Sequence, residues 1–594
     1  EGVQLNNRFV RYTGTLNLDH QATAKLSFGS NLTLARSRND RVKGDNYLDG
    51  VYSGAVKSLP YYSPYNEQGE LIGPNSPGYP SFPNFNPVGQ ALLPRFQTYA
   101  TKILGGIFAE YAFLPNLRFR TKVSADYNDV TDDQFEPSTT AIGGYLPGVG
   151  FKGYGIYGSG TYSTLINSTT VTYSQDWNDA HHFSALLGNE VLQRVERTSQ
   201  TAARLFPRDD FSYISSPDGD QIATVDQGAS FINRSGLLSF FGEFKYDYQE
   251  KYLFSITARE DGSSRFGRER RFGFFPSFSA GWRISAEPFV AAYTFVDDLK
   301  LRASYGFTGN ERIGEFKFLG TFSGATYSGS SGLAPNNLEN ASLQWESTRE
   351  LNLGLDLSVL NGRVGLTFDV YDNLTSDLLY DRPVPYTTGF GVFTGNIGQV
   401  SNRGFEVGLN TVNTEGAFRW STNFNLSHNV NKVVDIADSL PVFRGYTATP
   451  SGSTSAVLEG QPLGTFWGLR FRGVDAATGD AIYDDINGDG AIDGDDGTVI
   501  GNAQPVLIGG ITNRFSWKGF DLSAFFQFSY GNEILNYSNQ GLLNAGTDLS
   551  TNQVRDALRR WQKPGDITDV PRYEYRADQE GTSFNNFQSS RFVE

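Results

Sequence analysis

The chain has 594 residues, including 66 Gly, 46 Phe, 31 Tyr and 7 Trp, and a formal net charge of −15. Its hydrophobic fraction of 39% and its aromatic content exclude a disordered chain. The absence of Cys excludes disulfide scaffolds and thiolate chemistry, and four His residues leave little material for a His-based site. The acidic charge argues against nucleic acid as a partner. No apolar stretch approaches the roughly 20 residues of a membrane-spanning helix, which excludes helical membrane proteins but not membrane barrels.

Strict alternation of apolar and polar residues is the strongest pattern in the chain, and it predicts β-strands with one apolar face. In residues 117–127, for example, Leu117, Phe119, Val123 and Tyr127 alternate with charged and small residues. Many of these segments have the roughly nine to eleven residues that a tilted strand needs to cross a bilayer. The pattern recurs in about sixteen segments, over residues 12–19, 24–37, 101–111, 117–127, 163–173, 183–192, 238–246, 252–259, 276–284, 299–305, 351–359, 363–371, 404–411, 418–430, 511–517 and 522–530.

The connections between these segments alternate in length. Short links lie near residues 20–23, 112–116, 178–181, 247–251, 360–362, 414–416 and 518–520, and long links occupy 38–100, 130–157, 194–235, 306–344, 376–400 and 431–509. Asn361-Gly362 in one short link favours a two-residue hairpin turn. Alternation alone also fits a soluble sandwich, but short turns at one end and long loops at the other are typical of outer-membrane barrels. The predicted fold class is therefore all-β: a transmembrane antiparallel β-barrel with short periplasmic turns and long extracellular loops.

The first long link, residues 38–100, is rich in proline and aromatic residues. Eight of the 24 prolines lie between Pro60 and Pro94, and proline keeps such a loop stiff and outside the sheet. One interpretation is an ordered lid that packs on its own aromatic side chains. The other is a ligand-contact surface whose rings stack on sugars or hydrophobic side chains. The candidate ligand residues are Tyr61, Tyr62, Tyr65, Tyr79, Phe82 and Phe85.

The last long link, residues 431–509, contains a motif with the spacing of a calcium loop. Oxygen-bearing side chains fall at positions 1, 3, 5, 9 and 12, with Gly490 at position 6 for the sharp turn and a backbone carbonyl at position 7. Position 12 is Asp where a bidentate Glu is usual. The predicted Ca²⁺ would stiffen the loop, and the alternative is an acidic surface turn without an ion. The candidate metal ligands are Asp485, Asn487, Asp489, Ala491, Asp493 and Asp496.

Other motifs carry less information. The basic run RFGRERR at residues 265–271 is either an ordinary charged loop or a contact with anionic lipid headgroups. The pair His181-His182 falls at a short turn and is interpreted as solvated. No nucleophile elbow, phosphate loop or Ser-His-Asp arrangement is present, so we predict that the protein is not an enzyme and has no catalytic residues.

Several long motifs in order resemble the SusC/RagA-type TonB-dependent transporters of Bacteroidetes-like outer membranes. They are REDGSSRFG at 259–267, FFPSFSAGWRIS at 274–285, LQWESTRELNLGLDLSVLNGRVGLTFDVYDNLTSDLL at 343–379, NIGQVSNRGFEVGLN at 396–410, GQPLGTFWGLRFRGVD at 460–475 and KGFDLSAFFQFSYGNE at 518–533. The resemblance implies a 22-stranded barrel with an N-terminal plug. It also implies that the barrel is embedded in outer-membrane lipid and imports oligosaccharides or peptides. A SusD-like surface lipoprotein would cover the barrel, and TonB would supply the energy for import.

The resemblance leads us to expect that residues 1–594 are a partial barrel domain. The opening EGVQLNNRFVRYTGTLNLD resembles a segment already inside the family's barrel, and FNNFQSSRFVE resembles the stretch before its final strands. The plug and the terminal strands would then lie outside this chain. Two alternatives to import stay open: a structural or interaction barrel in a larger assembly, and a passive porin. An enzyme ranks last.

Overall fold

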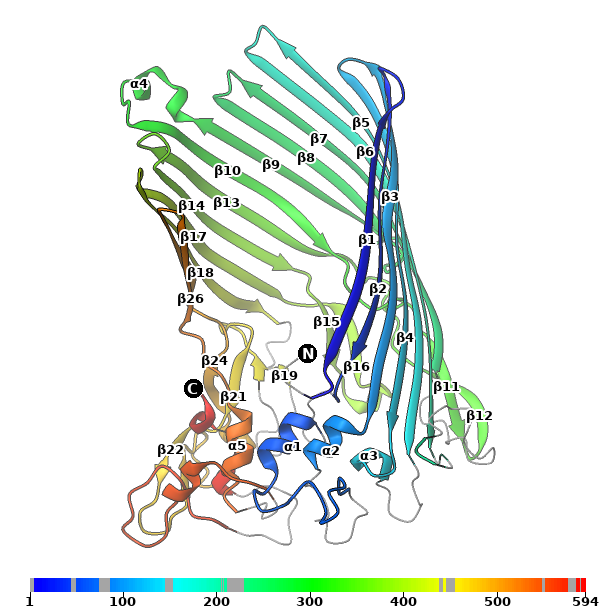
Figure 1. Ribbon diagram of the computed structural model, residues 1–594, viewed down its shortest axis with the longest axis vertical. Coiled ribbons are helices and arrows are strands. Elements are labelled where there is room, and N and C mark those ends of the chain that lie inside the picture. The colour runs from blue at the N-terminus through cyan, green and yellow to red at the C-terminus, as the bar shows by residue number, and fades with distance from the viewer. Residues whose placement is uncertain are drawn as a thin grey trace.

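The computed structural model describes residues 5–43, 50–73, 86–144, 153–204, 206, 208–210, 229–436, 442–444, 455–546, 551–574, 584–587 and 589–594. Sixteen antiparallel strands form one sheet in which each strand pairs with its neighbours in chain order. The sheet curves around an open interior (Figure 1). Its strands are β1 (Arg8–Gln21), β2 (Leu26–Asp40), β3 (Arg95–Leu114), β4 (Leu117–Glu136), β5 (Tyr154–Trp177), β6 (His181–Arg204), β7 (Ala229–Tyr248), β8 (Tyr252–Ser263), β9 (Phe272–Arg283), β10 (Val296–Asn310), β13 (Glu346–Val359), β14 (Val364–Ser376), β17 (Gln399–Thr414), β18 (Phe418–Asp435), β25 (Leu507–Trp517) and β26 (Phe520–Tyr530).

Shorter elements lie in the connections. No helix among the described residues is long and apolar enough to cross a membrane. The short strands are β11 (Phe322–Tyr327), β12 (Ser330–Pro335), β15 (Leu379–Pro383), β16 (Val392–Asn396), β19 (Val442–Arg444), β20 (Ser455–Val457), β21 (Thr465–Gly468), β22 (Phe471–Val474), β23 (Ala481–Tyr483) and β24 (Thr498–Asn502). The helices are α1 (Val51–Lys57), α2 (Pro87–Leu92), α3 (Ala141–Gly144), α4 (Pro288–Ala291) and α5 (Tyr537–Leu543), with 3₁₀ turns at Ile284–Ala286, Tyr386–Thr388, Gly494–Asp496, Arg555–Arg559, Phe584–Asn586 and Ser590–Phe592.

The predicted antiparallel sheet of about sixteen strands is confirmed, and each predicted segment overlaps one strand of it. The observed strands are longer than predicted: β5 runs over Tyr154–Trp177 where residues 163–173 were expected. Most of the added residues of β5 lie toward the long loop. Glycine and small polar residues dominate there, so the alternation that marks a strand in the sequence is lost although the ladder of hydrogen bonds continues.

The hairpin between β13 and β14 differs from the predicted two-residue turn. The last strand pair joins Val359 to Val364, so the loop has four residues, 360–363. Leu360, Asn361 and Gly362 all adopt positive φ values, of 61°, 58° and 75°. Asn361 and Gly362 therefore occupy two of the three positions with left-handed backbone conformation. The backbone N–H of Gly362 also donates to Asp297 Oδ2 at 2.8 Å.

The two faces of the sheet differ in polarity. On β13, Leu351 and Leu353 are 40% and 53% exposed, and on β6 Leu187 is 70% exposed. On β13 the strand neighbours on the other face are polar or small, such as Asn352 and Gly354. Apolar side chains exposed in this way along strands are placed for contact with lipid, and the polar face lines the interior.

All short turns lie at one end of the sheet, and the long connections gather at the other end (Figure 1). We call these the turn end and the loop end. Buried apolar clusters lie outside the sheet's interior, at the loop end, where Leu469, Ala481 and Tyr483 form one and Leu543, Val570 and Phe592 belong to another. The structural order of this molecule therefore comes from the sheet and from loops that pack on one another.

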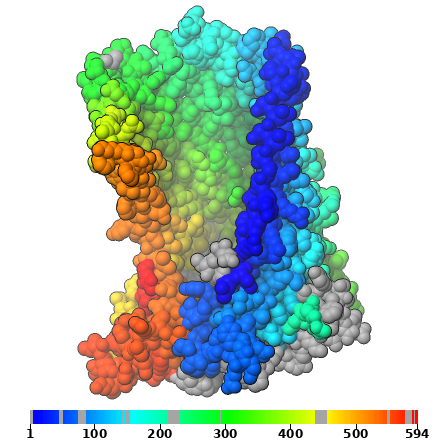
Figure 2. Space-filling model, in the orientation of Figure 1, coloured from blue at the N-terminus to red at the C-terminus, as the bar shows by residue number. Residues whose placement is uncertain are grey.

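Strands β1 and β26 are the two edges of the sheet, and within the described residues neither has a second partner strand. The space-filling view looks through the gap between them onto the interior wall (Figure 2). At the loop end, segments from opposite ends of the chain meet beneath this gap. The backbone N–H of Asn552 donates to the carbonyl oxygen of Lys57 at 2.7 Å, which ties the last loop to α1.

Candidate functional site

The interior wall carries charged side chains that neutralise one another across strands. On β10, Arg302 Nε donates to Asp356 Oδ2 of β13 at 2.8 Å, and its Nη2 donates to Asp369 Oδ2 of β14 at 3.1 Å. All three side chains are roughly one quarter to one third exposed. Because one guanidinium spans three adjacent strands, it fixes their register while leaving its charge partly open to the interior.

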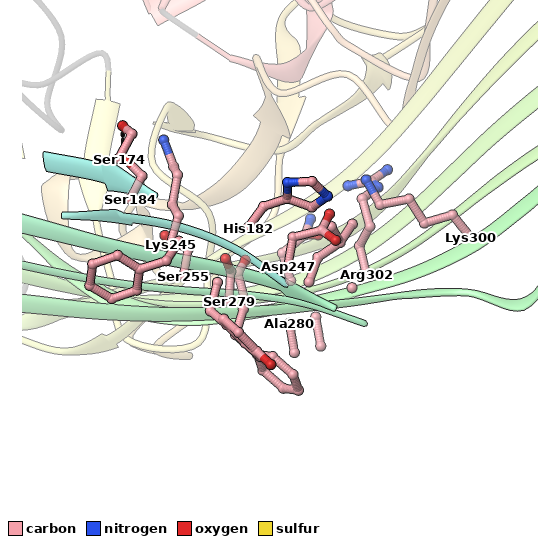
Figure 3. Close-up of a pocket in the computed structure, with 18 of the residues that line it drawn as sticks. Ser174, His182, Ser184, Lys245, Asp247, Ser255, Ser279, Ala280, Lys300 and Arg302 are labelled. Carbon is pink, nitrogen blue, oxygen red and sulfur yellow. Dashed lines mark hydrogen bonds between the residues drawn. The ribbon is translucent and has the colours of Figure 1, made fainter. Parts of the chain in front are cut away.

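Toward the turn end, the interior wall contains a shallow cavity of about 580 Å³. Figure 3 shows His182, Lys245, Asp247, Lys300 and Arg302 rising from one face of the sheet, with Ala280 on the opposite face. His182 Nδ1 lies 2.7 Å from Asp176 Oδ1. The adjacent His181 is on the other face, 2.7 Å from the hydroxyl of Tyr246. The two histidines are therefore divided between the faces and do not form one site.

Toward the loop end, the same wall combines ion pairs with aromatic rings. Arg41 Nη2 lies 2.6 Å from Asp132 Oδ1, and Lys43 Nζ lies 2.9 Å from Glu136 Oε1. Glu136 is only 4% exposed. Arg41, Lys43 and Glu136 border a cavity of about 480 Å³, whose lining also includes Phe96, Ile142, Tyr154, Ile156 and Arg204. Hydrogen-bonding groups beside rings of this kind suit polar cargo with apolar patches, such as sugars or peptides.

The candidate aromatic loop residues divide into two groups. Tyr61 and Tyr62 stand side by side, with ring centroids 4.7 Å apart, and Tyr61 is 71% exposed. Tyr65 bridges to Leu71 and is 43% exposed. Their exposed rings at the loop end are compatible with ligand contact, which stays a prediction. The other three candidates, Tyr79, Phe82 and Phe85, lie outside the described residues.

A single side chain organises this aromatic loop. Asn86 Nδ2 donates to the carbonyl oxygens of Pro64 and Ile72 at 2.8 and 2.9 Å. Its Oδ1 accepts the backbone N–H groups of Val88 and Gly89, which caps α2. Asn86 is 8% exposed, so the loop has an ordered base beneath its exposed rings.

The calcium-like motif forms a compact loop whose side chains accept its own backbone N–H groups. Asp485 accepts from Gly488 and Gly490, and Asp489 Oδ1 accepts from Ala491 at 2.8 Å. Asp496 is fully buried and accepts from Ile486 at 2.7 Å and from Asp493 at 2.9 Å. These N–H donors lower the pKa of the Asp496 carboxyl, first of all the N–H of Asp493.

This arrangement brings positions 1 and 12 of the motif toward the same turn, but the carboxylates face backbone donors. Among the described residues, no three His, Asp or Glu side chains converge as metal ligands. The donor set, all oxygen with a glycine at the sharp turn, has the chemistry that Ca²⁺ prefers. Asn487 Nδ2 donates to Asp489 Oδ2 at 2.9 Å, so ligation would require these two side chains to separate. Calcium binding by this loop stays a prediction.

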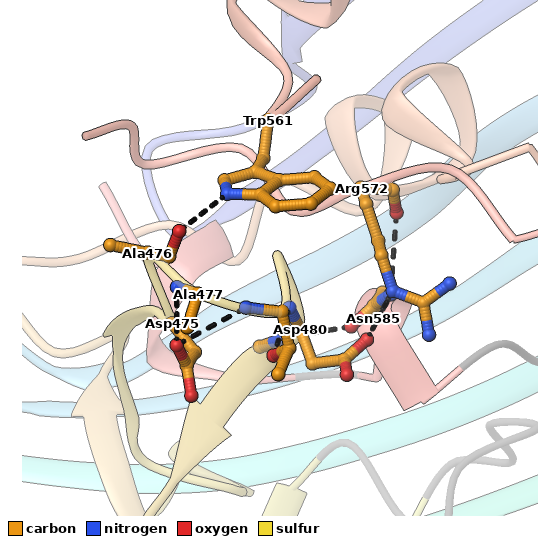
Figure 4. Close-up of polar contacts among 9 residues, drawn as sticks. Asp475, Ala476, Ala477, Asp480, Trp561, Arg572 and Asn585 are labelled. Atoms are coloured by element: carbon orange, nitrogen blue, oxygen red, sulfur yellow. Dashed lines mark hydrogen bonds and ion pairs between the residues drawn. The ribbon is translucent and has the colours of Figure 1, made fainter. Parts of the chain in front are cut away.

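The last part of the chain is clasped by the hairpin β22–β23, and we call this set of contacts the clasp (Figure 4). Arg572 Nε donates to Asp480 Oδ1 at 2.7 Å, and Trp561 Nε1 donates to the carbonyl oxygen of Ala476 at 3.0 Å. Asn585 Oδ1 accepts the backbone N–H of Ala481 at 2.8 Å. The clasp makes the loops after β18 and after β26 one packed body at the loop end.

Sequence reasoning missed the specific ion pairs of the wall and the clasp. Alternation places Arg302, Asp356 and Asp369 on polar faces, but only the strand register reveals that they meet. The signal for the clasp is weaker still, because Asp480 and Arg572 are separated by 92 residues. A tight turn with a positive-φ glycine at Gly479 is the one local feature that marks it.

A curved antiparallel sheet with lipid-facing apolar residues outside and paired charges inside defines the class of outer-membrane β-barrels. Residues 29–494 match the family described as "TonB dependent receptor-like, beta-barrel". The chain belongs to this family. The location in the outer membrane of a Gram-negative bacterium and the likeness to SusC/RagA-type TonB-dependent transporters, both expected from the motifs, are thereby confirmed.

Three similar proteins illustrate the match. TonB-dependent receptor P3 of Formosa agariphila is 32% identical over 96% of this chain and 58% of its own length. TonB-dependent receptor SusC of Bacteroides thetaiotaomicron is 28% identical over 93% of this chain and 56% of its own length. The solved RagAB peptide transporter superimposes with a TM-score of 0.84 and 22% identity, over 99% of this chain and 64% of that chain. The chain thus spans less than two thirds of each.

Proposed function

We propose that this chain forms the barrel wall of an outer-membrane importer for oligosaccharides or peptides. The observation that carries the proposal is the interior wall: a polar, ion-paired surface enclosed by a sheet whose other face is apolar. Such a wall provides a water-compatible path through lipid for cargo that cannot cross the bilayer.

The chemistry of the wall supports passage with no covalent step. Part of its charge is compensated locally, as at Arg302 with two aspartates, so the wall offers hydrogen bonds there without a strong local field that would trap charged cargo. At the loop end, exposed tyrosines and the aromatic-lined cavity supply stacking surfaces for a first contact. Binding there and release inward would then depend on gating.

The partners follow from the family. A SusD-like surface lipoprotein would cover the loop end. TonB would act through a plug domain of the kind that the resemblance to SusC/RagA-type transporters implies. The similarity to a solved peptide transporter supports peptides as one cargo class, and the similarity to SusC supports the SusC-like assembly.

The test is uptake by the native organism. A strain lacking the gene should lose uptake of one class among labelled oligosaccharides and peptides, and depletion of TonB should reproduce that loss. The protein extracted from the outer membrane should co-purify with a surface lipoprotein. Uptake that continues without TonB would indicate a porin, and loss of a surface assembly with normal uptake would indicate a scaffold. Glycan hydrolysis by the purified protein would indicate an enzyme.

A further inference from the structure

The outer face of the sheet carries arginines at the loop end that lack acidic partners. Alternation puts Arg197 of β6 on the same face as Val195, and Arg234 of β7 on the same face as Ile232, which is 56% exposed. Both arginines are exposed. Within the described part of the chain, neither forms an ion pair or a side-chain hydrogen bond. Their charge is therefore directed outward, away from the interior.

The positions of these arginines along their strands correspond to a membrane interface. Arg234 lies fourteen residues along β7 from Tyr248 at the turn end, and Arg197 lies sixteen residues along β6 from His181. With a rise of ~3.3 Å per residue and a strand tilt of about 40°, they stand about 35–40 Å above the turn end. The apolar band of a bilayer is about 25–30 Å thick. Both arginines thus reach the headgroup level of the extracellular leaflet.

The register places the two side chains within reach of one ligand. Val195 pairs with Arg234, and Arg197 pairs with Ile232. Arg197 and Arg234 are therefore diagonal neighbours on adjacent strands, with Cβ atoms about 7 Å apart. Two guanidinium forks at this spacing can approach one phosphate from both sides.

We call the outward-facing strand residues near the loop end the outer rim, and the other charged residues of this rim provide the comparison for Arg197 and Arg234. Some of the other outward acids and bases neutralise each other: Arg38 lies 2.8 Å from Asp40, and Asp372 lies 3.3 and 3.0 Å from Arg349 and Arg403. Further outward groups without an ion pair in the described chain are the bases Arg8, Arg36 and Lys432 and the acids Asp129 and Glu260. Although the chain has a net charge of −15, the uncompensated charge of this rim is positive.

The basic run at residues 265–271 does not account for this charge in full. Arg265, its first member, turns to the loop after β10, where its Nε lies 2.8 Å from Glu315 and its Nη1 lies 3.3 Å from Glu311. Its neighbour Phe266 is fully buried. The first residues of the run therefore stabilise the loop end.

We propose that Arg197 and Arg234 form a binding site for the phosphate group of an anionic lipid of the extracellular leaflet. The site goes beyond import, because it faces lipid and touches no residue of the interior wall. It depends only on the membrane location of the barrel, so its failure would leave the transport proposal intact.

The experiment uses the whole protein extracted in detergent from its native outer membrane. The probe is purified lipid A, compared with the same lipid after removal of its phosphates, with phosphatidylglycerol and with inorganic phosphate. The variant is Arg197→Gln with Arg234→Gln. The control is Arg194→Gln, which removes the same charge three residues away on β6 but from the interior face.

Each surface arginine near anionic lipid contributes about a five-fold change in affinity, so the double variant should bind phosphorylated lipid about 25-fold more weakly. The Arg194→Gln control should bind like the natural protein, and the dephosphorylated lipid should not distinguish the variants. Equal loss in the control, equal binding of the dephosphorylated lipid, or binding of inorganic phosphate alone would overturn the proposal. Correct folding of every variant is checked by its resistance to unfolding in unheated detergent gels.

Discussion

At the scale of single residues, Arg302 joins three strands of the interior wall. Replacing it by glutamine would leave Asp356 and Asp369 facing each other without a cation. Removing one partner of a fully buried ion pair costs about 3–5 kcal/mol, and these partly exposed groups should cost about 1–2 kcal/mol. We expect Arg302→Gln to lower the temperature at which the barrel unfolds on heated detergent gels.

Two further variants make this prediction specific. Arg419→Gln removes a cation from β18 that is exposed and has no ion pair in the described chain, and it should leave the unfolding temperature unchanged. Adding Asp369→Asn to Arg302→Gln should restore part of the lost stability, because one uncompensated carboxylate is removed. A double variant no more stable than Arg302→Gln would contradict this account.

Gly479 is the second residue whose role is testable. It has a φ of 79°, and a Cβ there would lie 2.4 Å from the indole ring of Trp561. Alanine at this position would therefore add a steric clash to backbone strain of about 1 kcal/mol. We expect Gly479→Ala to open the clasp and to expose residues 551–574 to limited proteolysis.

The matched control for Gly479 is Gly565. It has a φ of 95°, but nothing lies within 4 Å of the place its Cβ would occupy. Gly565→Ala carries the strain without the clash. If both variants are cleaved at the same rate, contact with Trp561 is not what holds the clasp.

At the scale of elements, the loop of residues 485–496 is the predicted calcium site. Its candidate ligands are held by local backbone N–H groups, which an ion would have to replace, and extracellular sites of this kind bind with constants of about 10⁻⁴–10⁻³ M. We expect millimolar Ca²⁺ to protect this loop from proteolysis and a chelator to reverse the protection. Asp489→Asn should weaken the effect at least ten-fold, since it removes a charged ligand at position 5.

Asp495→Asn is the control for this element. Asp495 lies in the same loop but at a position that donates no ligand in the predicted arrangement. If Ca²⁺ protects neither the natural loop nor this variant, the motif is an acidic turn closed by its own backbone, as its hydrogen bonds already permit.

At the scale of the whole molecule, the two edges of the sheet decide how it can exist in lipid. Unpaired backbone groups in hydrocarbon each cost several kcal/mol, and β1 and β26 have only one neighbour each in the described chain. We expect the 594-residue chain, produced by itself in detergent, to unfold in gels without heating. Resistance to unfolding until heated would mean that β1 and β26 can close on each other.

The sequence alone predicted the sheet and its location because both depend on local, repeated features. Alternation with a period of two identifies each strand and its apolar face, and link lengths separate the turn end from the loop end. The candidate oxygen ligands at residues 485–496 also come from spacing, and calcium binding there stays a prediction. What was missed locally, such as the four-residue loop after Val359, depends on backbone geometry that Asn-Gly allows without fixing.

Only the tertiary structure decided which charges meet. Arg302 finds Asp356 and Asp369 through the register of three strands, Asp480 finds Arg572 across 92 residues, and Arg197 stands beside Arg234 with no acid between them. The physical reason is that alternation specifies on which face of the sheet a side chain lies, but not beside which residue of the neighbouring strand. For the arginines of the sheet, a one-residue change in register would move the side chain to the opposite face and to another neighbour. Asp480 and Arg572 meet through the packing of two loops that are distant in sequence. The sequence thus determines which face of each strand is polar, and the pairing of the strands determines which side chains on that face are in contact.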